Sequence, residues 1–321
     1  AVSTAADSMS LHPRIADASV ELPGGPLEGY LDIDAVIDAA LSANCDAIHP
    51  GYGFLAERAD LARKCDEAGL TFVGPSAETL ELFGDKARAR SLASAHGVPI
   101  VPGSDGLTTS VDAARGVATE LGFPIVLKAS AGGGGRGMRR VNSTDELEAA
   151  FEAAEREAAA AFGDGSLLVE RLIVDPRHIE VQILADGAGH VVHLWERDCS
   201  LQLRNQKVVE FAPAPDLDGA VRERVLADAV TLATAGRYTN AGTFEFLVDP
   251  DSGEHWFIEA NPRIQVEHTV TEEITGIDLV QAQLRIAGGG TLADLGIAEQ
   301  AAVPEPRGSA VQARVVLTGG G

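Results

Sequence analysis

The sequence predicts an α/β protein with antiparallel portions of α+β character, and three observations lead to this prediction. First, segments with the period of helices alternate with short strand-like segments over residues 1–75, as in LDIDAVIDAALSANC followed by DAIHP. Second, later helical segments end at Gly97 and Gly122, and each is followed by an extended segment. Third, two strand-like segments flank the turn sequence DPDSG near residue 250, which indicates an antiparallel hairpin.

The elements follow one another in a consistent order. After the helix DLARKCDEAGL and the strand TFVGP, helical segments cover ETLELFGDKARARSLASAHG and DAARGVATELG. FPIVLKAS and GMRRVNS are strand-like and flank a glycine-rich loop, and Ser143 to Glu146 match a capping box that begins the helix DELEAAFEAAEREAAAAFG. The remaining elements are the strands SLLVERLI, RHIEVQILAD and GHVVHLWERD, the helix VRERVLADAVTLATAGR, the hairpin GTFEFLVDPDSGEHWFIEAN, the helix DLVQAQLRIAGGG and a last strand in AVQARVV.

Composition excludes several classes of function. A formal net charge of −23 argues against nucleic acid or an anionic membrane as the main partner. No apolar run approaches the length of about 18 residues that a membrane-spanning helix needs. Cys45, Cys65 and Cys199 form no CxxC pair, and the first residues lack the basic and apolar stretches of a signal peptide. We therefore expect a cytoplasmic protein that concentrates its positive charge locally.

The glycine-rich loop lies in KASAGGGGRGM, residues 128–138. Gly132, Gly134 and Gly137 satisfy the dinucleotide-binding spacing GxGxxG, but a strand follows them where that motif requires a helix. A Walker A loop is excluded because the lysine precedes the glycines. The pattern therefore predicts a strand-connecting loop whose backbone N–H groups fold over phosphates as a lid, and the alternative is an ordinary surface loop.

The hairpin near residue 250 predicts a metal site. If the turn is centred on Ser252, Glu245 lies directly opposite Glu259 on one face of the strands. Facing carboxylates repel unless a cation lies between them, and Asn261 adds an amide oxygen on the same side. We therefore expect Mg²⁺ here, and the alternatives are two solvated glutamates or a different register. The predicted core face contains Phe244, Phe246, Trp256 and Ile258.

The next segment, RIQVEH, combines charges of both signs. If it is extended, Arg263, Gln265 and Glu267 lie on one side, opposite Ile264 and Val266. A guanidinium, an amide and a carboxylate in a row can bind a small planar oxyanion beside a general base. The alternative is an exposed edge strand.

A family resemblance rests on HPGYGFLAE, FGDKARAR, IVLKASAGGGGRGM, ERDCSLQLRNQKVVEFAPAP and GTFEFL…FIEANPRIQVEHTVTEEITGIDLV. Together these segments resemble biotin carboxylase, the ATP-grasp component of carboxylases that act on acetyl-CoA, propionyl-CoA, pyruvate or related substrates. The resemblance implies an ATP-grasp fold with a mobile glycine-rich lid, preceded by part of a Rossmann-like N-terminal domain. The implied domains are an N-terminal domain at 1–82, an ATP-grasp region at 83–303 with its lid at about 100–172, and the start of a C-terminal domain at 304–321.

The resemblance also implies roles for individual residues. For ATP it implies Lys86, Lys128, Gly132, Gly133, Gly134, Gly135, Gly137, Met138, Glu170, Arg171, Ile173, His178, Gln202, Asn205 and Leu247. For Mg²⁺ or Mn²⁺ it implies Glu245, Glu259 and Asn261, for bicarbonate Arg263, Gln265 and Val266, and for biotin Tyr52 and Arg314. The implied catalytic residues are Glu267, Arg263, Lys207 and Arg314, with Glu267 as the general base.

The implied reaction is an ATP-dependent ligation that forms a C–N bond. Bicarbonate is deprotonated and phosphorylated to carboxyphosphate, and the resulting CO₂ is transferred to biotin. The implied partners are a biotin carboxyl carrier domain or protein, a carboxyltransferase, and a second copy of the chain in a homodimer.

Three positions depart from the family pattern. Leu203 and Asn205 stand where the family usually has basic residues, and Pro262 replaces a threonine. Two other interpretations remain open on the residues alone. One is a different ATP-grasp ligase, such as a carbamoyl phosphate synthetase or a purine-pathway carboxylase, and the other is a nucleotide-binding module without turnover.

Overall fold

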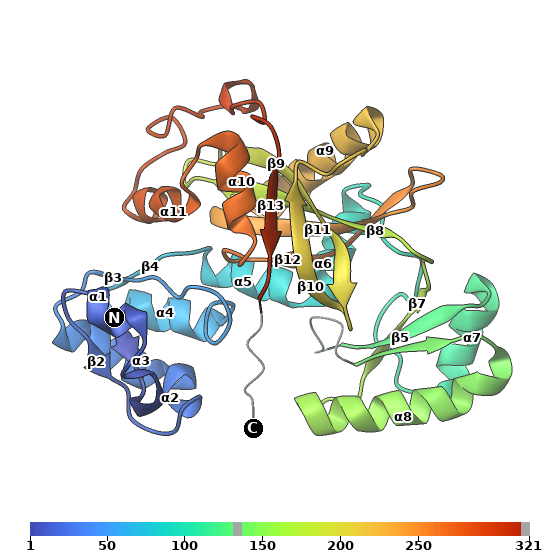
Figure 1. Ribbon diagram of the computed structural model, residues 1–321. Coiled ribbons are helices and arrows are strands. Elements are labelled where there is room, and N and C mark those ends of the chain that lie inside the picture. Colours follow the sequence, from blue (N-terminus) through green and yellow to red (C-terminus); the bar gives the residue numbers. More distant parts are fainter. Residues whose placement is uncertain (131–136, 316–321) are drawn as a thin grey trace.

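A six-stranded sheet and a three-stranded sheet organise most of the chain (Figure 1). The structure is a computed structural model that describes residues 1–130 and 137–315. The six-stranded sheet has the order β12-β11-β8-β9-β10-β13, and the three-stranded sheet has the order β6-β5-β7. Helices and sheets are mixed as the sequence predicted. Within the described residues, none of the helices combines the length and the apolar character needed to cross a bilayer.

The N-terminal part is built from short parallel strand pairs and helices. β1 (Val2–Ser3) pairs with β2 (Val20–Glu21), and β3 (Ala47–Ile48) pairs with β4 (Thr71–Phe72). The helices are α1 (Leu11–Ile15), α2 (Glu28–Leu31), α3 (Ile33–Ser42) and α4 (Ala59–Ala68). α4 ends where Gly69 takes the left-handed conformation, with φ 73°, which glycine adopts without steric penalty.

Two helices then lead to the large sheet. α5 (Ala77–Gly84) and α6 (Lys86–Ala95) are separated at Asp85, whose side chain accepts hydrogen bonds from the backbone N–H groups of Ala87 and Arg88. This N-cap begins α6 directly at Lys86. Lys86 is therefore held at the first turn of a helix that packs beside β12.

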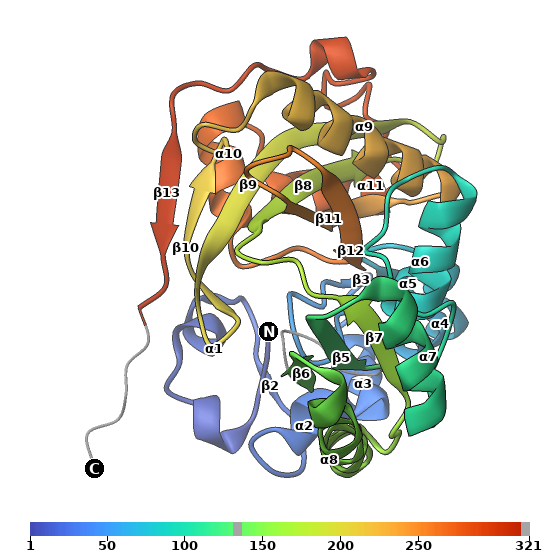
Figure 2. The ribbon, with the colours of Figure 1, turned by 90° about the vertical axis from the view of Figure 1, so that its right-hand side faces the viewer.

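The three-stranded sheet lies to one side of the large sheet (Figure 2). It consists of β5 (Ile125–Ala129), β6 (Met138–Val141) and β7 (Leu167–Arg171), and α7 (Val111–Leu121) and α8 (Thr144–Phe162) pack on it. α8 begins at Ser143 as predicted, but the reciprocal bonds of a capping box are not formed. The Ser143 side chain makes no capping bond, and Glu146 accepts from the backbone N–H of Asn142 instead.

The large sheet is antiparallel throughout. Its strands are β8 (Arg177–Ala185), β9 (Val191–Leu203), β10 (Gln206–Ala212), β11 (Asn240–Val248), β12 (His255–Asn261) and β13 (Ala310–Ala313). α9 (Gly219–Ala235) covers one face, and α11 (Leu279–Ala287) covers part of the other, where Leu184 and Ala241 are buried. α10 (His268–Thr275) lies beside β13 and β9.

The β11–β12 hairpin contains a bulge. Glu245 pairs with Glu259, which confirms the predicted register at that position. Immediately beyond, the register shifts, and Phe246 pairs with Phe257. Between the carboxylate pair and the turn, β12 therefore contains one residue more than β11. Such an extra residue locally reverses which side chains of the strand point to each face of the sheet.

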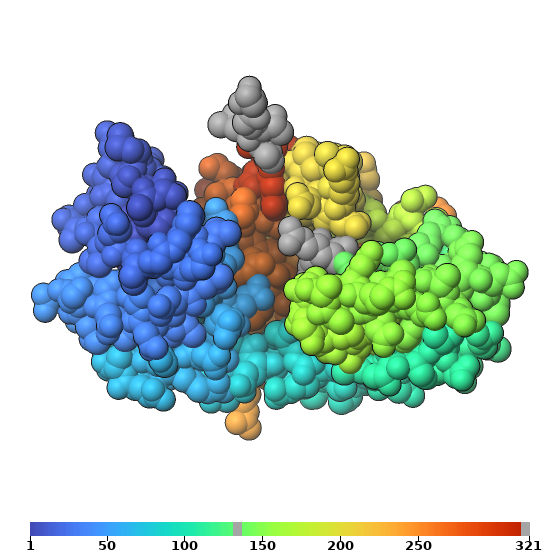
Figure 3. All heavy atoms as spheres, turned by 90° about the horizontal axis from the view of Figure 1, so that it is seen from below, coloured from blue at the N-terminus to red at the C-terminus, as the bar shows by residue number. Residues whose placement is uncertain are grey.

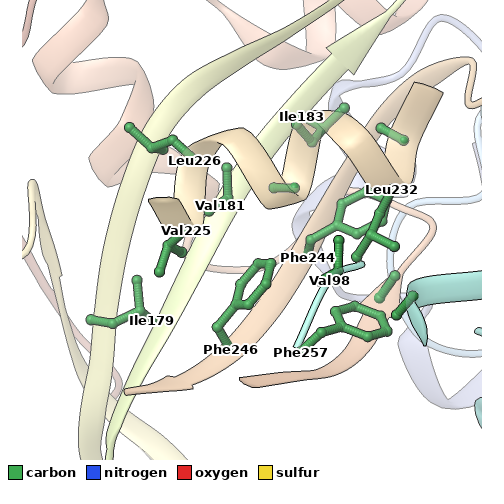
Figure 4. Packing of buried hydrophobic residues seen from close by; sticks show 14 of the residues in the cluster. Val98, Ile179, Val181, Ile183, Val225, Leu226, Leu232, Phe244, Phe246 and Phe257 are labelled. Carbon is green, nitrogen blue, oxygen red and sulfur yellow. The ribbon is translucent and has the colours of Figure 1, made fainter. Parts of the chain in front are cut away.

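The bulge makes the predicted core face wrong on β12. Phe244 and Phe246 are fully buried against α9, as expected, and Figure 4 shows Phe257 beside them. Trp256 and Ile258, which were predicted to share this core, are only partly buried. Phe257 takes their place because the shifted alternation turns it toward the apolar face.

Candidate functional site

Three glutamates lie in a row across the large sheet. Glu259 on β12 pairs with Glu245 on β11, and Glu245 pairs with Glu180 on β8. Directly paired residues share a face, so the three carboxylates lie on the side opposite the aromatic core. Glu180 is fully buried and Glu245 nearly so. Buried carboxylates require cationic or hydrogen-bonding partners, and the surrounding residues supply them.

Lys207, on β10, is the central cation of this site. Its Nζ donates to Glu180, to Glu245 at 3.0 Å and to Glu267 at 2.9 Å. Burial lowers the pKa of Lys207, but the charges of Glu245 and Glu267 outweigh burial and raise it overall. Burial likewise opposes ionisation of Glu245 and Glu267, yet Lys207 holds the pKa of both carboxyls below the usual value. At neutral pH the ammonium group of Lys207 therefore faces ionised carboxylates at Glu245 and Glu267.

Arg197, on β9, is a second buried cation next to the row. It pairs with Glu180 at 3.4 Å and donates to Gln265 Oε1 at 2.7 Å, and its side chain is fully buried. Further hydrogen bonds go to Gln182, Thr243 and Thr271. Arg197 thus fixes the position of Gln265, one of the predicted bicarbonate residues, relative to the carboxylate row.

His178 continues the row toward the β9–β10 turn. Its Nε2 lies 2.7 Å from Glu245 Oε2, and its Nδ1 lies 2.8 Å from Gln202 Nε2. Leu247 pairs with His178 across β11 and β8, and Asn205 occupies the left-handed turn between β9 and β10, with φ 62°. Asparagine tolerates this conformation well, which is a local reason for its presence in the turn.

The predicted lysine contacts to ATP lie at two edges of the site. Lys86 Nζ is 3.2 Å from Glu259 Oε2, so α6 brings it to the carboxylate row. Lys128, on β5, pairs with Glu170 on β7 at 2.5 Å. Glu170 is buried and also accepts from Arg90 Nη1 at 2.7 Å. Glu170 therefore connects the three-stranded sheet to α6.

Other predicted nucleotide residues are peripheral or lie outside the described residues. Arg171 ends β7 and is exposed, Ile173 follows it, and Met138, which begins β6, is 44% exposed. Gly137 lies just before β6 in a left-handed conformation. Gly132, Gly133, Gly134 and Gly135 lie outside the described residues.

The segment 262–267 is a loop rather than the extended strand that was considered. Glu267 immediately precedes α10, and both Gln265 and Glu267 are buried. Arg263 donates to Glu57 Oε1 at 2.6 Å and to Asn261 Oδ1 at 3.0 Å. Gln265 contacts Arg197 and Glu245, and Glu267 contacts Lys207, so tertiary partners rather than strand alternation place these side chains.

The loop between β3 and α4 approaches the same site. It contains Glu57, which holds Arg263, and Tyr52, which is 55% exposed. Viewed from below, the surface is hollowed between the N-terminal part in blue and the region of α8 in green (Figure 3). On the far side of Lys207, Arg314 donates to Glu267 Oε2 at 2.8 Å and to Glu210 Oε1 at 2.6 Å.

The predicted metal ligands fit Mg²⁺ in their chemistry. Glu245 and Glu259 are directly opposed oxygen donors, and Asn261 Nδ2 donates to Glu245 at 2.6 Å, which places its amide beside them. In this structure two lysines balance the negative charge of the opposed carboxylates: Lys86 forms an ion pair with Glu259, and Lys207 forms one with Glu245. His178, Glu180 and Glu245 also offer ligand atoms that lie close together.

Sequence reasoning missed several residues of the site. They are Glu180, Arg197, Arg90, Glu57 and Glu210. For Glu180 a signal was present, because HIEVQ places His178, Glu180 and Gln182 on one face of a strand whose other face is apolar. Arg197 gave no local signal, because its five partners come from β8, β11, α10 and the loop 262–267.

The chain matches two family descriptions and many known proteins. Residues 1–80 match "Biotin carboxylase, N-terminal domain" and residues 85–295 match "Carbamoyl-phosphate synthase L chain, ATP binding domain". Pyruvate carboxylase 1 of Caenorhabditis elegans is 54% identical over 311 residues, and the human mitochondrial pyruvate carboxylase is 52% identical. Each match covers 96% of this chain but 26% of the relative, so the chain spans about a quarter of the length of these proteins.

Solved structures agree with these matches. The biotin carboxylase of Campylobacter jejuni, solved as a β,γ-ATP complex, has a TM-score of 0.93 and 44% identity over 98% of this chain and 69% of its own. The biotin carboxylase domain of Hydrogenobacter thermophilus 2-oxoglutarate carboxylase, a dimer solved with MgADP, ADP and bicarbonate, has a TM-score of 0.92 and 46% identity over 98% of this chain and 68% of its own. The expected ATP-grasp fold is confirmed, and the chain belongs to the biotin carboxylase family.

Proposed function

We propose that this chain carries the biotin carboxylase activity of a biotin-dependent carboxylase, in which ATP and bicarbonate are used to carboxylate biotin on a carrier. One observation supports this more than any other: Lys207 joins the carboxylate row of Glu180 and Glu245 to Glu267. In this proposal the nucleotide site and the oxyanion site share one cation, Lys207. The family membership and the ligands named for the H. thermophilus domain support the same proposal.

In the proposed reaction, Glu267 removes the proton of bicarbonate, which Arg263, Gln265 and the Val266 backbone bind. Its lowered pKa keeps it ionised and able to accept a proton at neutral pH. The bicarbonate oxygen attacks the γ-phosphorus of ATP, and the bond to the β-phosphate oxygen breaks to release ADP. Lys207 stabilises the negative charge that develops between the two reactants.

The second stage transfers CO₂ to biotin. Carboxyphosphate breaks down to CO₂ and phosphate, and the phosphate accepts the N1′ proton of biotin. N1′ then attacks CO₂ and forms the C–N bond, while Arg314 stabilises the charge on the ureido oxygen. Tyr52 is proposed to lie beside the biotin, in the loop that also supplies Glu57.

On the nucleotide side, Lys86, Lys128 and the glycine-rich loop are proposed to contact the phosphates. Glu170, His178 and Gln202 are proposed to bind the remainder of the nucleotide, with Arg171, Ile173, Leu247, Asn205 and Met138 around it. Glu245, Glu259 and Asn261 would hold Mg²⁺, which neutralises phosphate charge when bound. The same proposal divides the chain at residues 82 and 303, with the lid between about 100 and 172.

The proposed partners are a biotin carboxyl carrier, a carboxyltransferase and a second copy of the chain. The relatives in C. elegans and humans are named pyruvate carboxylases, which favours pyruvate as the final acceptor in the full-length protein. Carboxylation of pyruvate in preference to acetyl-CoA by the full-length protein would support this assignment.

The activity can be tested by measuring ADP release by the full-length protein with and without bicarbonate and free biotin. We expect release to require bicarbonate and to rise with biotin. Glu267→Gln keeps the size of the side chain but removes the base, and we expect it to lower the biotin-dependent rate by about 10²–10⁴-fold.

The matched control is Glu272→Gln, in the second turn of α10 and outside the carboxylate row. It should retain the wild-type rate within a small factor. Equal biotin-dependent rates for wild type and Glu267→Gln would remove Glu267 as the base. ATP binding without bicarbonate-dependent ADP formation would favour a nucleotide-binding module, and turnover with a different cosubstrate would favour another ATP-grasp ligase.

A further inference from the structure

Glu210 is a buried carboxylate that the proposed reaction does not use. The register of β10 and β13 pairs Glu210 with Gln312, so Arg314, two residues further along, extends on the same face of the sheet. The Glu210 side chain is fully buried, and its Oε1 accepts a hydrogen bond from Arg314 Nε at 2.6 Å. Arg314 is therefore held by a partner that is inaccessible to solvent.

The burial of Glu210 is not explained by packing. Within residues 1–130 and 137–315, Glu210 Oε2 has no hydrogen-bond partner. Burial raises the pKa of the Glu210 carboxyl even though Arg314 favours its charged form. Burying an apolar side chain of similar size would cost less free energy. We therefore infer that the carboxylate has a function that offsets the cost of its desolvation.

Arg314 connects Glu210 to the proposed general base. Its Nη2 donates to Glu267 Oε2 at 2.8 Å while its Nε remains with Glu210. Two anchors on different nitrogens fix the plane of a guanidinium. Without Glu210, Arg314 would be free to form a two-bond pair with Glu267, which would withdraw the guanidinium from any other ligand.

We propose that Glu210 is a positioning residue for Arg314: it keeps one side of the guanidinium away from Glu267 and orients the group for the ureido oxygen of biotin. This inference rests on the proposed function, because it needs Arg314 at the biotin. It assigns Glu210 to the carboxylation of biotin and not to the bicarbonate-dependent cleavage of ATP.

The experiment compares two rates in the full-length protein: ADP release with bicarbonate alone, and the additional release on adding free biotin. Glu210→Gln retains an oxygen that can accept from Nε but removes the charge, and Glu210→Asp retains the charge but withdraws it from Nε. We expect both variants to lower the biotin-dependent increment by about ten- to a hundredfold. The rate with bicarbonate alone should stay within about twofold of wild type, which also shows that the variants are folded.

Glu196→Gln is the matched control. Glu196 is also fully buried, its Oε1 also accepts from an arginine Nε (Arg222, at 2.7 Å), and its Oε2 also has no partner among the described residues. Among the described residues, Glu196 forms no hydrogen bond or ion pair with Arg314 or Glu267, so we expect Glu196→Gln to change both rates by the same factor, if at all. Arg314→Gln combined with Glu210→Gln should be no slower than Arg314→Gln alone.

Two results would overturn the inference in distinguishable ways. If Glu210→Gln and Glu196→Gln change both rates equally, Glu210 has only a structural role, while the proposed function stands. If wild type shows no increment with biotin, or Arg314→Gln retains the full increment, the proposed role of Arg314 itself fails, and the inference about Glu210 fails with it.

Discussion

The two faces of the large sheet are both buried, yet they are built from opposite chemistry. On one face Phe244, Phe246 and Phe257 pack against α9 in an apolar cluster. On the other, two residues of the same strands, Glu245 and Glu259, face Lys207 and Lys86. The apolar face gains stability from burial, whereas buried charges contribute little net stability even when they are paired. The charged face is therefore best explained by what it binds.

The largest effect is expected from breaking the charged face at its most connected residue. Arg197→Met removes one of the positive charges that pair with the buried Glu180 carboxylate, and it removes the hydrogen bond that holds Gln265. We therefore expect a loss of about 3–5 kcal/mol in the free energy of unfolding. ADP release should fall at least about a hundredfold, because the predicted bicarbonate site is displaced. Urea unfolding and the ADP assay measure the two effects.

The control for this variant is Arg177→Met on the neighbouring strand. Arg177 pairs with Asp198 at 2.6 Å, outside the carboxylate row. We expect it to lose less than about 2 kcal/mol and to retain turnover. Similar losses of activity in both variants would contradict a special role for Arg197.

The apolar face should respond in stability only. Phe244→Ala opens a cavity in the aromatic core, and we expect it to lower the free energy of unfolding by about 3–5 kcal/mol. At a temperature where the variant is folded, its turnover should remain within a few-fold of wild type. The exposed Phe54 is the control, and Phe54→Ala should lose less than about 1 kcal/mol. A Phe244→Ala variant that is stable but inactive would show that the two faces are not separable.

The smallest effect concerns the metal. We expect MgADP to stabilise the wild-type protein against thermal unfolding more than ADP with EDTA does, by up to about 2–3 kcal/mol at high ligand excess. In Glu259→Gln we expect the additional stabilisation by magnesium to be lost, while part of the stabilisation by ADP alone remains. The exposed Glu254, beyond the bulge on the same hairpin, is the control, and Glu254→Gln should respond as wild type does. Retention of the magnesium effect in Glu259→Gln would remove it as a ligand.

The comparison also shows why the sequence predicted one part of the site and not another. Glu245 and Glu259 were placed correctly because a short hairpin couples them through local geometry. The bulge beside them was not predicted, so Trp256 and Ile258 were assigned to the wrong face. Nothing in the local pattern of DPDSG reports an extra residue several positions away.

Residues joined by distant contacts could not be predicted from local pattern. Arg197 meets Thr271 across 74 residues, and Arg263 meets Glu57 across 206 residues. The loop 262–267 was considered as a strand because its alternation is regular, but its side chains are arranged by tertiary partners. The role of Lys207 came from resemblance, whereas the pattern of RIQVEH already indicated a base at Glu267, and the contact between the two residues is a feature of the fold.

The irregularity in the β11–β12 hairpin has a consequence for how this site can vary. Because the extra residue lies between the opposed carboxylates and the turn, a change of loop length at residues 249–254 can be absorbed there by adding or removing the unpaired position. Insertions and deletions in the loop at residues 249–254 would therefore leave the pairing of Glu245 with Glu259 unchanged. We expect grafted loops of different length at this tip to be tolerated, whereas a single residue inserted between Thr243 and Glu245 would turn the acid toward the aromatic layer.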